Sequence, residues 1–353
     1  MKLSIVIPYL RGGGSERFAV NLANGMISKG HEVFVLTAHP IENEYQLEDN
    51  VRRIELIKHK KILYDSSKLR SFNKKNKIDI CVAIGIYPNI CAGLASFGKY
   101  KKVKYILCER NDPVHDKLSI LSKTARKLLF WRGDGFVFQT SDAKSFYSKA
   151  IQKRSVVISN PVKSGLPDRS DERKKEFVAV GRLSPQKNYK MLIKAFGVVC
   201  KNNKDYILRI FGQGELSEEL KALANQLGIE ERVIFEGYKE NVHECIKDSD
   251  IYVLSSFFEG MPNALMEAMA MGFPVISTDC PAGGSKVLIN DGINGLLTEV
   301  DDYEKLATKM LFMINNFHQK EMMGKEARKI REVCSLPAII DKWENYINQI
   351  NCE

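Results

Sequence analysis

Two carboxylates and a predicted helix start lie close together between Ser256 and Ala270. Pro262 suits the first turn of a helix, and a run of apolar residues continues it. The backbone N–H groups near Asn263 to Leu265 would then have no helical acceptor, and a helix N-terminus attracts anions. Glu259 precedes this helix start and Glu267 follows it by about one turn. The alternative, that Glu267 only pairs on a helix surface, is disfavoured because a carboxylate within an apolar helix is costly. The segment predicts a phosphate site between two acids.

Two cations five residues apart follow the first predicted strand of the second half of the chain. They are Arg182 and Lys187, in the sequence Gly-Arg-Leu-Ser-Pro-Gln-Lys-Asn. Ligands of open α/β sheets bind at the carboxyl ends of strands, where an arginine and a lysine could neutralise a diphosphate. The alternative is a solvated basic loop.

A glycine loop, Gly12-Gly13-Gly14, follows the first strand and opens a helix, so its backbone could approach an anion. It does not match a dinucleotide fingerprint, because Arg17 occupies the position of the last glycine, and it lacks the Gly-Lys-Ser/Thr ending of a P-loop. A plain tight turn is the alternative.

Short β-branched runs alternate with helical periods along most of the chain, which predicts parallel sheets. The alternation breaks at residues 159–173, where Pro, Gly and charged residues indicate a linker. We expect two Rossmann-like, doubly wound domains, residues 1–163 and 164–336. The strands expected in the first are Leu3–Pro8, Glu32–Thr37, Ile78–Ala83, Lys104–Cys108, Gly135–Gln139 and Ser155–Ile158, and those in the second are Phe177–Val180, Tyr206–Phe211, Val233–Phe235, Ile251–Ser255 and Pro274–Ser277. Three helices should end the chain, at Tyr303–Asn316, Gln319–Val333 and Pro337–Ile350.

Composition narrows the class of protein. The chain has 353 residues, 44% of them hydrophobic and 27% charged, which is typical of a globular protein. Its eight cysteines form no Cys-x-x-Cys pair and its six histidines are dispersed, so we expect reduced core thiols and no structural zinc. No apolar run reaches the roughly 20 residues of a membrane span and no signal peptide is evident, so the expected location is the cytoplasm.

The net charge of +10 is unevenly distributed. Residues 1–163 carry about twice as many basic as acidic side chains, whereas the rest of the chain is slightly acidic. The amphipathic segment from Lys117 to Arg132 adds Leu and Trp to this basic half. It predicts either a docking face for an anionic membrane or an ordinary packed helix with a solvated side.

Taken in order, these motifs resemble glycosyltransferase family 4 (glycosyl transferases group 1), the retaining transferases of GT-B fold. The resemblance rests on the glycine loop, the Arg182–Lys187 loop, the Glu-x7-Glu spacing of Glu259 and Glu267, and two later segments, Gly272–Asp279 and Asp291–Gly295. It covers nearly the whole chain. It implies two domains that face each other across a cleft, with the C-terminal helix, residues 337–353, returning to the first domain.

The resemblance also implies roles. Glu259, Arg182 and Lys187 would be catalytic, with Glu259 on the donor sugar and the two cations on its diphosphate, and Glu267 would bind the ribose. Backbone contacts to the nucleotide-sugar donor would come from Gly13, Gly14, Gly260, Asn263, Ala264 and Leu265. In such enzymes the leaving diphosphate helps to deprotonate the acceptor hydroxyl, so neither a protein nucleophile nor an obligatory divalent metal or other cofactor is expected. Asp248-Ser249-Asp250 spells the Asp-x-Asp of metal-dependent transferases, but it precedes a buried-looking strand, so we expect no metal site.

One departure from the family concerns the loop after the strand Lys104–Cys108, where many members carry a histidine. Here the loop reads Glu-Arg-Asn-Asp-Pro, and its polar residues Arg110, Asn111 and Asp112 are candidate contacts for the acceptor or the donor sugar.

The sequence-based hypothesis is a UDP-sugar-dependent hexosyl- or N-acetylhexosaminyltransferase of bacterial surface polysaccharide synthesis (O-antigen, capsule or lipopolysaccharide). It would act on a saccharide or lipid-linked acceptor, bind no nucleic acid and associate peripherally with the inner face of the plasma membrane. The rival hypotheses are a non-hydrolysing sugar-nucleotide epimerase, which shares the two-domain architecture, and a nucleic-acid-binding module, which the basic half would suit. Replacing Glu259, Arg182 or Lys187 by alanine is expected to change stability by less than about 0.5 kcal/mol, as exposed substitutions usually do.

Overall fold

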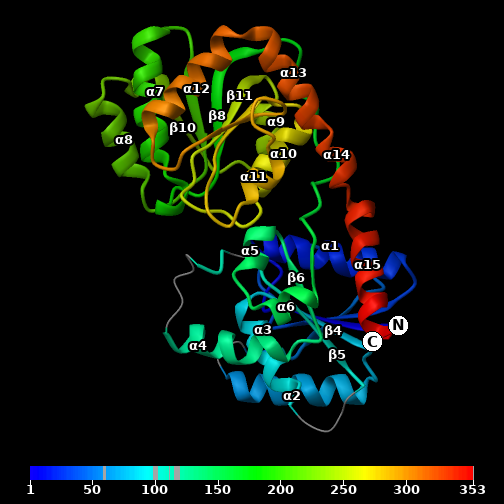
Figure 1. Ribbon diagram of the computed structural model, residues 1–353. Helices are drawn as coiled ribbons and strands as arrows, with labels where there is room; N and C mark the ends of the chain where they lie inside the picture. The colour runs from blue at the N-terminus through cyan, green and yellow to red at the C-terminus, as the bar shows by residue number, and fades with distance from the viewer. Residues whose placement is uncertain (59–60, 98–101, 111, 115–119, 353) are drawn as a thin grey trace. The chain divides into compact units, whose positions relative to one another are not determined.

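The computed structural model describes residues 1–58, 61–97, 102–110, 112–114 and 120–352. The chain forms two compact units (Figure 1). Unit 1 comprises Met1–Pro161 and Leu336–Glu353, and unit 2 comprises Val162–Ser335. These limits lie within two residues of the boundaries expected from the sequence.

Unit 1 is built on a seven-stranded sheet in the order β3-β2-β1-β4-β5-β6-β7, and every neighbouring pair is parallel. Helices cover both faces of this sheet, α1 and α15 on one and α2 and α3 on the other (Figure 1). The strands are β1 Lys2–Val6, β2 Glu32–Thr37, β3 Arg52–Glu55, β4 Ile80–Ile84, β5 Lys104–Cys108, β6 Gly135–Phe138 and β7 Ser155–Val157; the helices are α1 Gly14–Ser28, α2 Ile62–Lys75, α3 Ile86–Ala95, α4 Ile120–Leu129, η1 Phe130–Arg132, α5 Ser141–Ser145, α6 Lys149–Lys153 and α15 Leu336–Cys352.

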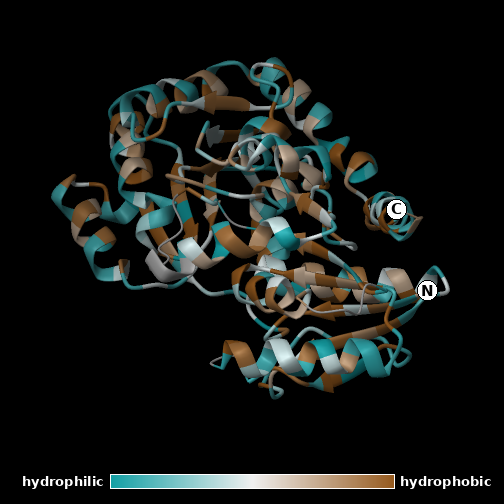
Figure 2. Ribbon diagram, turned by 60° about the horizontal axis from the view of Figure 1, so that its bottom comes forward, coloured by the Kyte–Doolittle hydropathy of each residue, from teal (hydrophilic) through white to brown (hydrophobic). Residues whose placement is uncertain are grey.

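Because helices cover both faces of this sheet, its strands carry apolar side chains on both faces. Leu3 and Ile5 of β1 lie in one core cluster, whereas Val6 lies in the other. Figure 2 shows the resulting predominance of hydrophobic residues along the strands.

The last helix, α15, belongs to the core of unit 1. Its Trp343 ring is fully buried, with its centroid 5.5 Å from that of Phe18 on α1. The hydroxyl of Tyr346 accepts a hydrogen bond from the Phe136 N–H (2.8 Å) and donates one to the Arg154 carbonyl (2.6 Å). These contacts attach the C-terminal helix to β6 and to the segment before β7.

Unit 2 contains a six-stranded parallel sheet in the order β10-β9-β8-β11-β12-β13. Within the unit, α7, α8 and α12 cover one face, and α10 covers the other (Figure 1). The strands are β8 Lys174–Val180, β9 Ile207–Phe211, β10 Val233–Gly237, β11 Ser249–Leu254, β12 Val275–Thr278 and β13 Leu296–Thr298; the helices are η2 Pro185–Lys187, α7 Tyr189–Asn202, α8 Ser217–Gln226, η3 Glu230–Arg232, α9 Val242–Ile246, α10 Asn263–Met271, α11 Gly284–Leu288, α12 Tyr303–Asn315, α13 Phe317–Arg328 and α14 Ile330–Val333.

The predicted fold class is therefore confirmed: both units are parallel-sheet α/β folds. Three local predictions were wrong. The strands β3 and β13 were missed, the single helix expected at Gln319–Val333 is two helices, α13 and α14, and Pro262 is the N-cap of α10 instead of a residue of its first turn. Among the described helices, none combines the length and hydropathy needed to cross a bilayer.

Candidate active site

The order of strands in unit 2 creates a switch point between β8 and β11. From β8 the sheet grows to β9 and β10 on one side and to β11, β12 and β13 on the other. In open α/β sheets, the crevice at the carboxyl ends of two such strands is the usual ligand site. The loops that leave β8 and β11 there carry the basic motif and the first glutamate.

These two loops bring Lys187 and Glu259 into contact. The Lys187 Nζ lies 2.5 Å from Glu259 Oε1, and the side chains are 18% and 9% exposed. The hydroxyl of Ser256 donates a second hydrogen bond to the same oxygen (2.7 Å). Because both partners are largely removed from water, the pair holds an ammonium and a carboxylate at fixed positions at the edge of the sheet.

Main-chain and side-chain hydrogen bonds hold the two loops side by side. Gln186 accepts from the Phe257 N–H (2.8 Å) through its carbonyl and donates to the Phe258 carbonyl (2.9 Å) through its side-chain amide. The hydroxyl of Ser255 donates to the Lys187 carbonyl (2.9 Å). The backbone of both loops, which sets the geometry of the ion pair, is therefore fixed by hydrogen bonds between them.

A close backbone contact fixes the loop after Glu259. A Cβ atom at Gly284, the first residue of α11, would lie 1.9 Å from the Gly260 carbonyl oxygen. Only glycine allows this approach. Gly260 itself is partly exposed, so its backbone remains accessible.

The helix α10 begins next to this loop. Its first helical hydrogen bond runs from the Met266 N–H to the Pro262 carbonyl (3.1 Å). The N–H groups of residues 263–265 precede any helical acceptor, as at every helix start. Asn263 and Ala264 are partly exposed, whereas the side chain of Leu265 is buried, so Leu265 can offer only its backbone.

The second glutamate of the motif has a partner that the sequence did not indicate. A hydrogen bond of 2.9 Å joins Glu267 Oε2, on α10, to His243 Nε2, on α9. Both side chains are nearly buried. The cost of placing this carboxylate in an apolar helix is thus offset by an imidazole. No spacing rule could have found His243, because it lies on a separate helix 24 residues earlier.

A buried tyrosine lies close enough to both glutamates to feel their charge. The pKa of Tyr252, on β11, is raised well above its usual value, first by burial and then by the neighbouring ionisable groups of Tyr189, Glu267 and Glu259. Its hydroxyl faces the Val180 carbonyl at the end of β8 (3.5 Å). Glu259 and Glu267 therefore both lie within electrostatic range of the same tyrosine.

Arg182 lies on the same loop as Lys187 but is exposed. Its guanidinium makes no hydrogen bond or ion pair with the residues described here. Unit 2 thus brings together Lys187, Glu259 and the start of α10, places Glu267 further along that helix, and leaves Arg182 accessible at the edge.

The Asp-x-Asp sequence lies at the opposite end of β11. The Asp250 carboxylate accepts hydrogen bonds from Lys320 Nζ (2.7 Å) and from the Tyr206 hydroxyl (2.6 Å), all buried. It is the anion of a structural ion pair. No cluster of three His, Cys, Asp or Glu side chains suited to a metal occurs in the described parts of the chain.

In unit 1, the glycine loop leads into α1. Gly12 has a φ of +90°, which favours glycine, whereas Gly13 is extended (φ −133°) and is the N-cap. Gly14 is the first helical residue. The Glu16 carboxylate occupies the space that a side chain at Gly13 would fill, and burial raises the pKa of that carboxyl.

The loop after β5 contains the candidate contact residues Arg110 and Asp112, both buried; Asn111 lies outside the described residues. The Arg110 guanidinium carbon lies 3.3 Å from the centroid of the Phe18 ring. Its Nε, Nη1 and Nη2 atoms are buried and have no hydrogen-bond partner in the structure that is described. Burial lowers the pKa of Arg110 to about 10, so the side chain remains charged at neutral pH.

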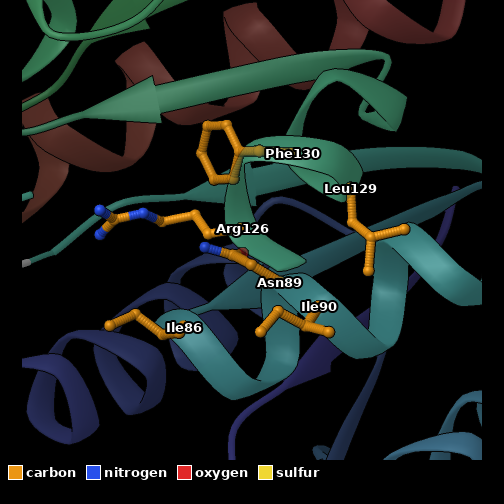
Figure 3. Close-up of a pocket in the computed structure, with 6 residues that line it drawn as sticks. All are labelled: Ile86, Asn89, Ile90, Arg126, Leu129 and Phe130. Atoms are coloured by element: carbon orange, nitrogen blue, oxygen red, sulfur yellow. The ribbon is translucent and has the colours of Figure 1, made fainter. Parts of the chain in front are cut away.

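A small hollow between α3 and α4 is lined mainly by apolar groups (Figure 3). Arg126 lies along it and donates to the Pro113 carbonyl (2.9 Å), while the Asn89 side chain exchanges hydrogen bonds with the backbone of Cys108. The hollow has no room for a water-sized molecule. It is a packing defect and not a ligand site.

Comparison with known proteins matches both units. The family model described as "Glycosyltransferase Family 4" matches residues 12–164, and that described as "Glycosyl transferases group 1" matches residues 167–330. The chain is 30% identical over 364 residues to a Campylobacter jejuni protein, GalNAc-α-(1→4)-GalNAc-α-(1→3)-diNAcBac-PP-undecaprenol α-1,4-N-acetyl-D-galactosaminyltransferase, with 99% of each chain covered. The chain is a family 4, group 1 glycosyltransferase.

Other relatives of this glycosyltransferase agree with the assignment. It is 26% identical over 343 residues to an uncharacterised Haemophilus influenzae glycosyltransferase, covering 95% of this chain and 96% of the relative. In fold it is similar to Anabaena Alr3699/HepE, solved in complex with UDP, with a TM-score of 0.85, 18% identity, and 99% and 100% of the two chains covered. The GT-B fold is thereby shown.

Proposed function

We propose that this glycosyltransferase moves a hexosyl or N-acetylhexosaminyl group from a UDP-sugar to a saccharide or lipid-linked saccharide, with retention of the anomeric configuration. The observation that carries the proposal is the contact between Lys187 and Glu259 beside the start of α10. UDP as the nucleotide is supported by the UDP complex of the similar Anabaena structure, and a lipid-linked acceptor of surface polysaccharide synthesis by the name of the Campylobacter relative.

In this proposal, unit 2 binds the donor by charge. Arg182 and Lys187 contact the diphosphate, together with backbone N–H groups at Gly260 and at the start of α10. As the sugar–phosphate bond breaks, negative charge grows on the leaving phosphate, and fixed cations and helix N–H groups stabilise it. Glu259 contacts the donor sugar and Glu267 the ribose.

The reaction then needs no protein nucleophile. The acceptor oxygen bonds to the anomeric carbon, the bond from that carbon to the β-phosphate oxygen breaks, and the departing diphosphate takes the hydroxyl proton. The products are UDP and the glycoside. No divalent metal is required for this step in the proposal, so chelation should leave the transfer rate unchanged.

Donor turnover tests the proposal. Release of UDP is measured with UDP-sugars and lipid-linked acceptors, using the variants Arg182→Ala, Lys187→Met and Glu259→Gln. Lys190→Met is the matched control, because Lys190 is 47% exposed on α7 and paired with Glu219. Each site variant should lose at least about 100-fold in rate, as when a transition-state donor is removed, and the control should not. Wild-type rates in all three site variants would end the proposal.

The same assay separates the rival functions. A non-hydrolysing epimerase would convert the UDP-sugar into its epimer, still attached to UDP, and would glycosylate no acceptor. If the enzyme is a transferase, the stereochemistry of the glycoside shows whether it retains or inverts the anomeric configuration. A nucleic-acid-binding module would release no UDP at all.

We also propose that unit 1 docks on the inner face of the plasma membrane, which would place the protein in the cytoplasm. Next to the basic side chains of α4 and η1, three large apolar side chains are exposed: Leu128 by 61%, Trp131 by 53% and Phe97 by 45%. Apolar groups among cations suit an anionic bilayer surface. Trp131→Ser should weaken binding to vesicles that contain anionic lipid. Val333→Ser, at an exposed valine of unit 2, is the control. Equal binding by both variants would count against docking through this face.

A further inference from the structure

A buried arginine of unit 1 lacks the counter-charge that its burial requires. Arg110 follows β5 and is 6% exposed. None of its three guanidinium nitrogens has a hydrogen-bond partner in the described structure. Buried polar groups are nearly always hydrogen-bonded and buried charges are nearly always paired. An orphaned guanidinium therefore indicates a partner that none of the described residues supplies.

The acids next to Arg110 in the sequence have other partners. Glu109 accepts the Arg110 backbone N–H on Oε1 (3.1 Å) and the Tyr147 hydroxyl on Oε2 (2.9 Å). Asp112 accepts the Val114 backbone N–H (2.8 Å). These hydrogen bonds organise the loop, and the Arg110 guanidinium is not among their donors.

The guanidinium lies over the face of an aromatic ring. Its carbon lies 3.3 Å from the centroid of Phe18, whose ring also contacts the buried Trp343. A guanidinium carries its N–H groups in its own plane, in a fork that matches two oxygens of a phosphate. Packing on Phe18 holds the guanidinium in place and occupies none of its N–H donors.

Phe18 also relates Arg110 to the start of α1. It lies one turn into this 15-residue helix, and helical side chains lean towards the N-terminus. The first helical hydrogen bond runs from the Arg17 N–H to the Gly13 carbonyl (3.2 Å), and Gly13 has no side chain that could cap the earlier N–H groups. The Glu16 carboxylate already accepts its own backbone N–H at this helix start, so the anion site depends on the Arg110 guanidinium and not on the N-terminus of α1.

We propose that Arg110 is an anion subsite that binds a phosphate group of the acceptor. The proposal rests on the proposed function in one respect: the donor diphosphate has its own cations, Arg182 and Lys187, in unit 2. A diphosphate-linked acceptor, such as the name of the Campylobacter relative describes, carries a second phosphate group of the required chemistry.

The binding test uses inorganic pyrophosphate as the probe and the full-length chain with UDP saturating the donor site. Binding is followed by calorimetry, with bound UDP monitored separately. The variant is Arg110→Gln. The matched control is Arg52→Gln, because Arg52 also lies over a ring, that of Phe34 at 5.4 Å, but is exposed and paired with Glu32.

Wild type and Arg52→Gln should bind pyrophosphate, and Arg110→Gln should bind it at least about tenfold more weakly, since hydrogen bonds to charged groups are strong. All three should bind UDP equally. Unchanged pyrophosphate binding in Arg110→Gln, or none in the UDP-loaded wild type, overturns the proposal. If UDP fails to bind while pyrophosphate binds through Arg110, the proposed donor site is wrong and the anion subsite stands.

Thermal unfolding separates ligand binding from a structural role. Arg110→Met removes the unpaired charge and keeps the packing on Phe18, so without pyrophosphate it should melt no lower than wild type. With UDP saturating the donor site, pyrophosphate should raise the melting temperature of wild type and of Arg52→Gln, and should leave that of Arg110→Met unchanged. A variant that melts well below wild type in phosphate-free buffer would assign Arg110 to the fold and refute the subsite.

Kinetics identify the acceptor as the source of the phosphate. Two acceptors with the same terminal sugar are compared, one on a lipid diphosphate and one on an uncharged aglycone. Arg110→Gln should raise KM at least about tenfold for the first and leave it unchanged for the second. Equal effects on both acceptors would contradict the assignment to an acceptor phosphate.

Discussion

Breaking the contact between Lys187 and Glu259 should affect stability, donor binding and transfer in different ways. An exposed ion pair contributes roughly 0–1 kcal/mol, whereas removing one partner of a fully buried pair costs about 3–5 kcal/mol. At 18% and 9% exposure this pair lies between those limits. Lys187→Met leaves the Glu259 carboxylate with the Ser256 hydroxyl, so we expect a loss of about 1–3 kcal/mol in the free energy of unfolding.

This expectation corrects the one made from the sequence. A change below about 0.5 kcal/mol assumes an exposed side chain. Arg182 is exposed, and the small value stands for it. The Glu259 side chain is only 9% exposed, so for Glu259 and Lys187 the premise of a surface substitution was wrong.

Glu259→Gln should separate binding from transfer. The carboxylate competes with phosphate for the Lys187 ammonium, so the neutral amide should let UDP bind as tightly as in wild type, or more tightly. Transfer should nevertheless fall by at least about 100-fold, because a group that acts on the reacting sugar is lost. Lys187→Met should instead weaken UDP binding by about 10- to 100-fold, the value of a charged hydrogen bond.

The measurements are urea unfolding, calorimetric titration with UDP, and UDP release, on the two single variants and the double variant. In the double variant no unpaired charge remains. Its loss of unfolding free energy should therefore be about 1 kcal/mol smaller than the sum of the two single-variant losses. Additive losses, together with a Glu259→Gln protein that binds UDP far more weakly than wild type, would refute the reasoning.

Three further predictions concern other residues. Gly284→Ala should destabilise unit 2 by about 1–3 kcal/mol, because the added methyl group overpacks against the Gly260 carbonyl, and it should abolish UDP binding. Urea unfolding measures the first effect and calorimetry the second. An unchanged calorimetric titration with UDP would show that this contact is dispensable. Lys320→Met should lower the free energy of unfolding by about 3 kcal/mol, because it leaves Asp250 buried without its cation. The kcat per folded molecule should stay at the wild-type value. A fall in kcat would reopen a catalytic role for the Asp-x-Asp sequence. Burial, followed by the charge of the N-terminus, lowers the pKa of His31 in the folded state, so below a pH of about 6.5 the unfolded chain binds the extra proton and stability falls. His31→Asn should flatten the decline in unfolding free energy between pH 7 and pH 5, and an equally steep decline in the variant would exclude His31 as its cause.

Local pattern predicted most elements of the fold, and the misses have physical reasons. β2 and β5 were predicted with their observed bounds because they are buried on both faces and read as continuous apolar runs. β3, Arg52–Glu55, is a partly exposed edge strand with three charged side chains in four residues, so it carries no such signal. β13 has only three residues, too few for a period to be recognised.

The sequence by itself determined which residues could do chemistry, because loops after buried strands and the starts of apolar helices are encoded by neighbouring residues. It placed Lys187 after one strand and Glu259 after another, 72 residues later, without showing that they touch. Only the tertiary structure decided that, since β11 pairs with β8 through the register of Tyr252 with Val178, and strand order depends on how the crossover helices pack. The same holds for the burial of Arg110, because whether a charge finds a partner is set by side chains that are distant in the chain.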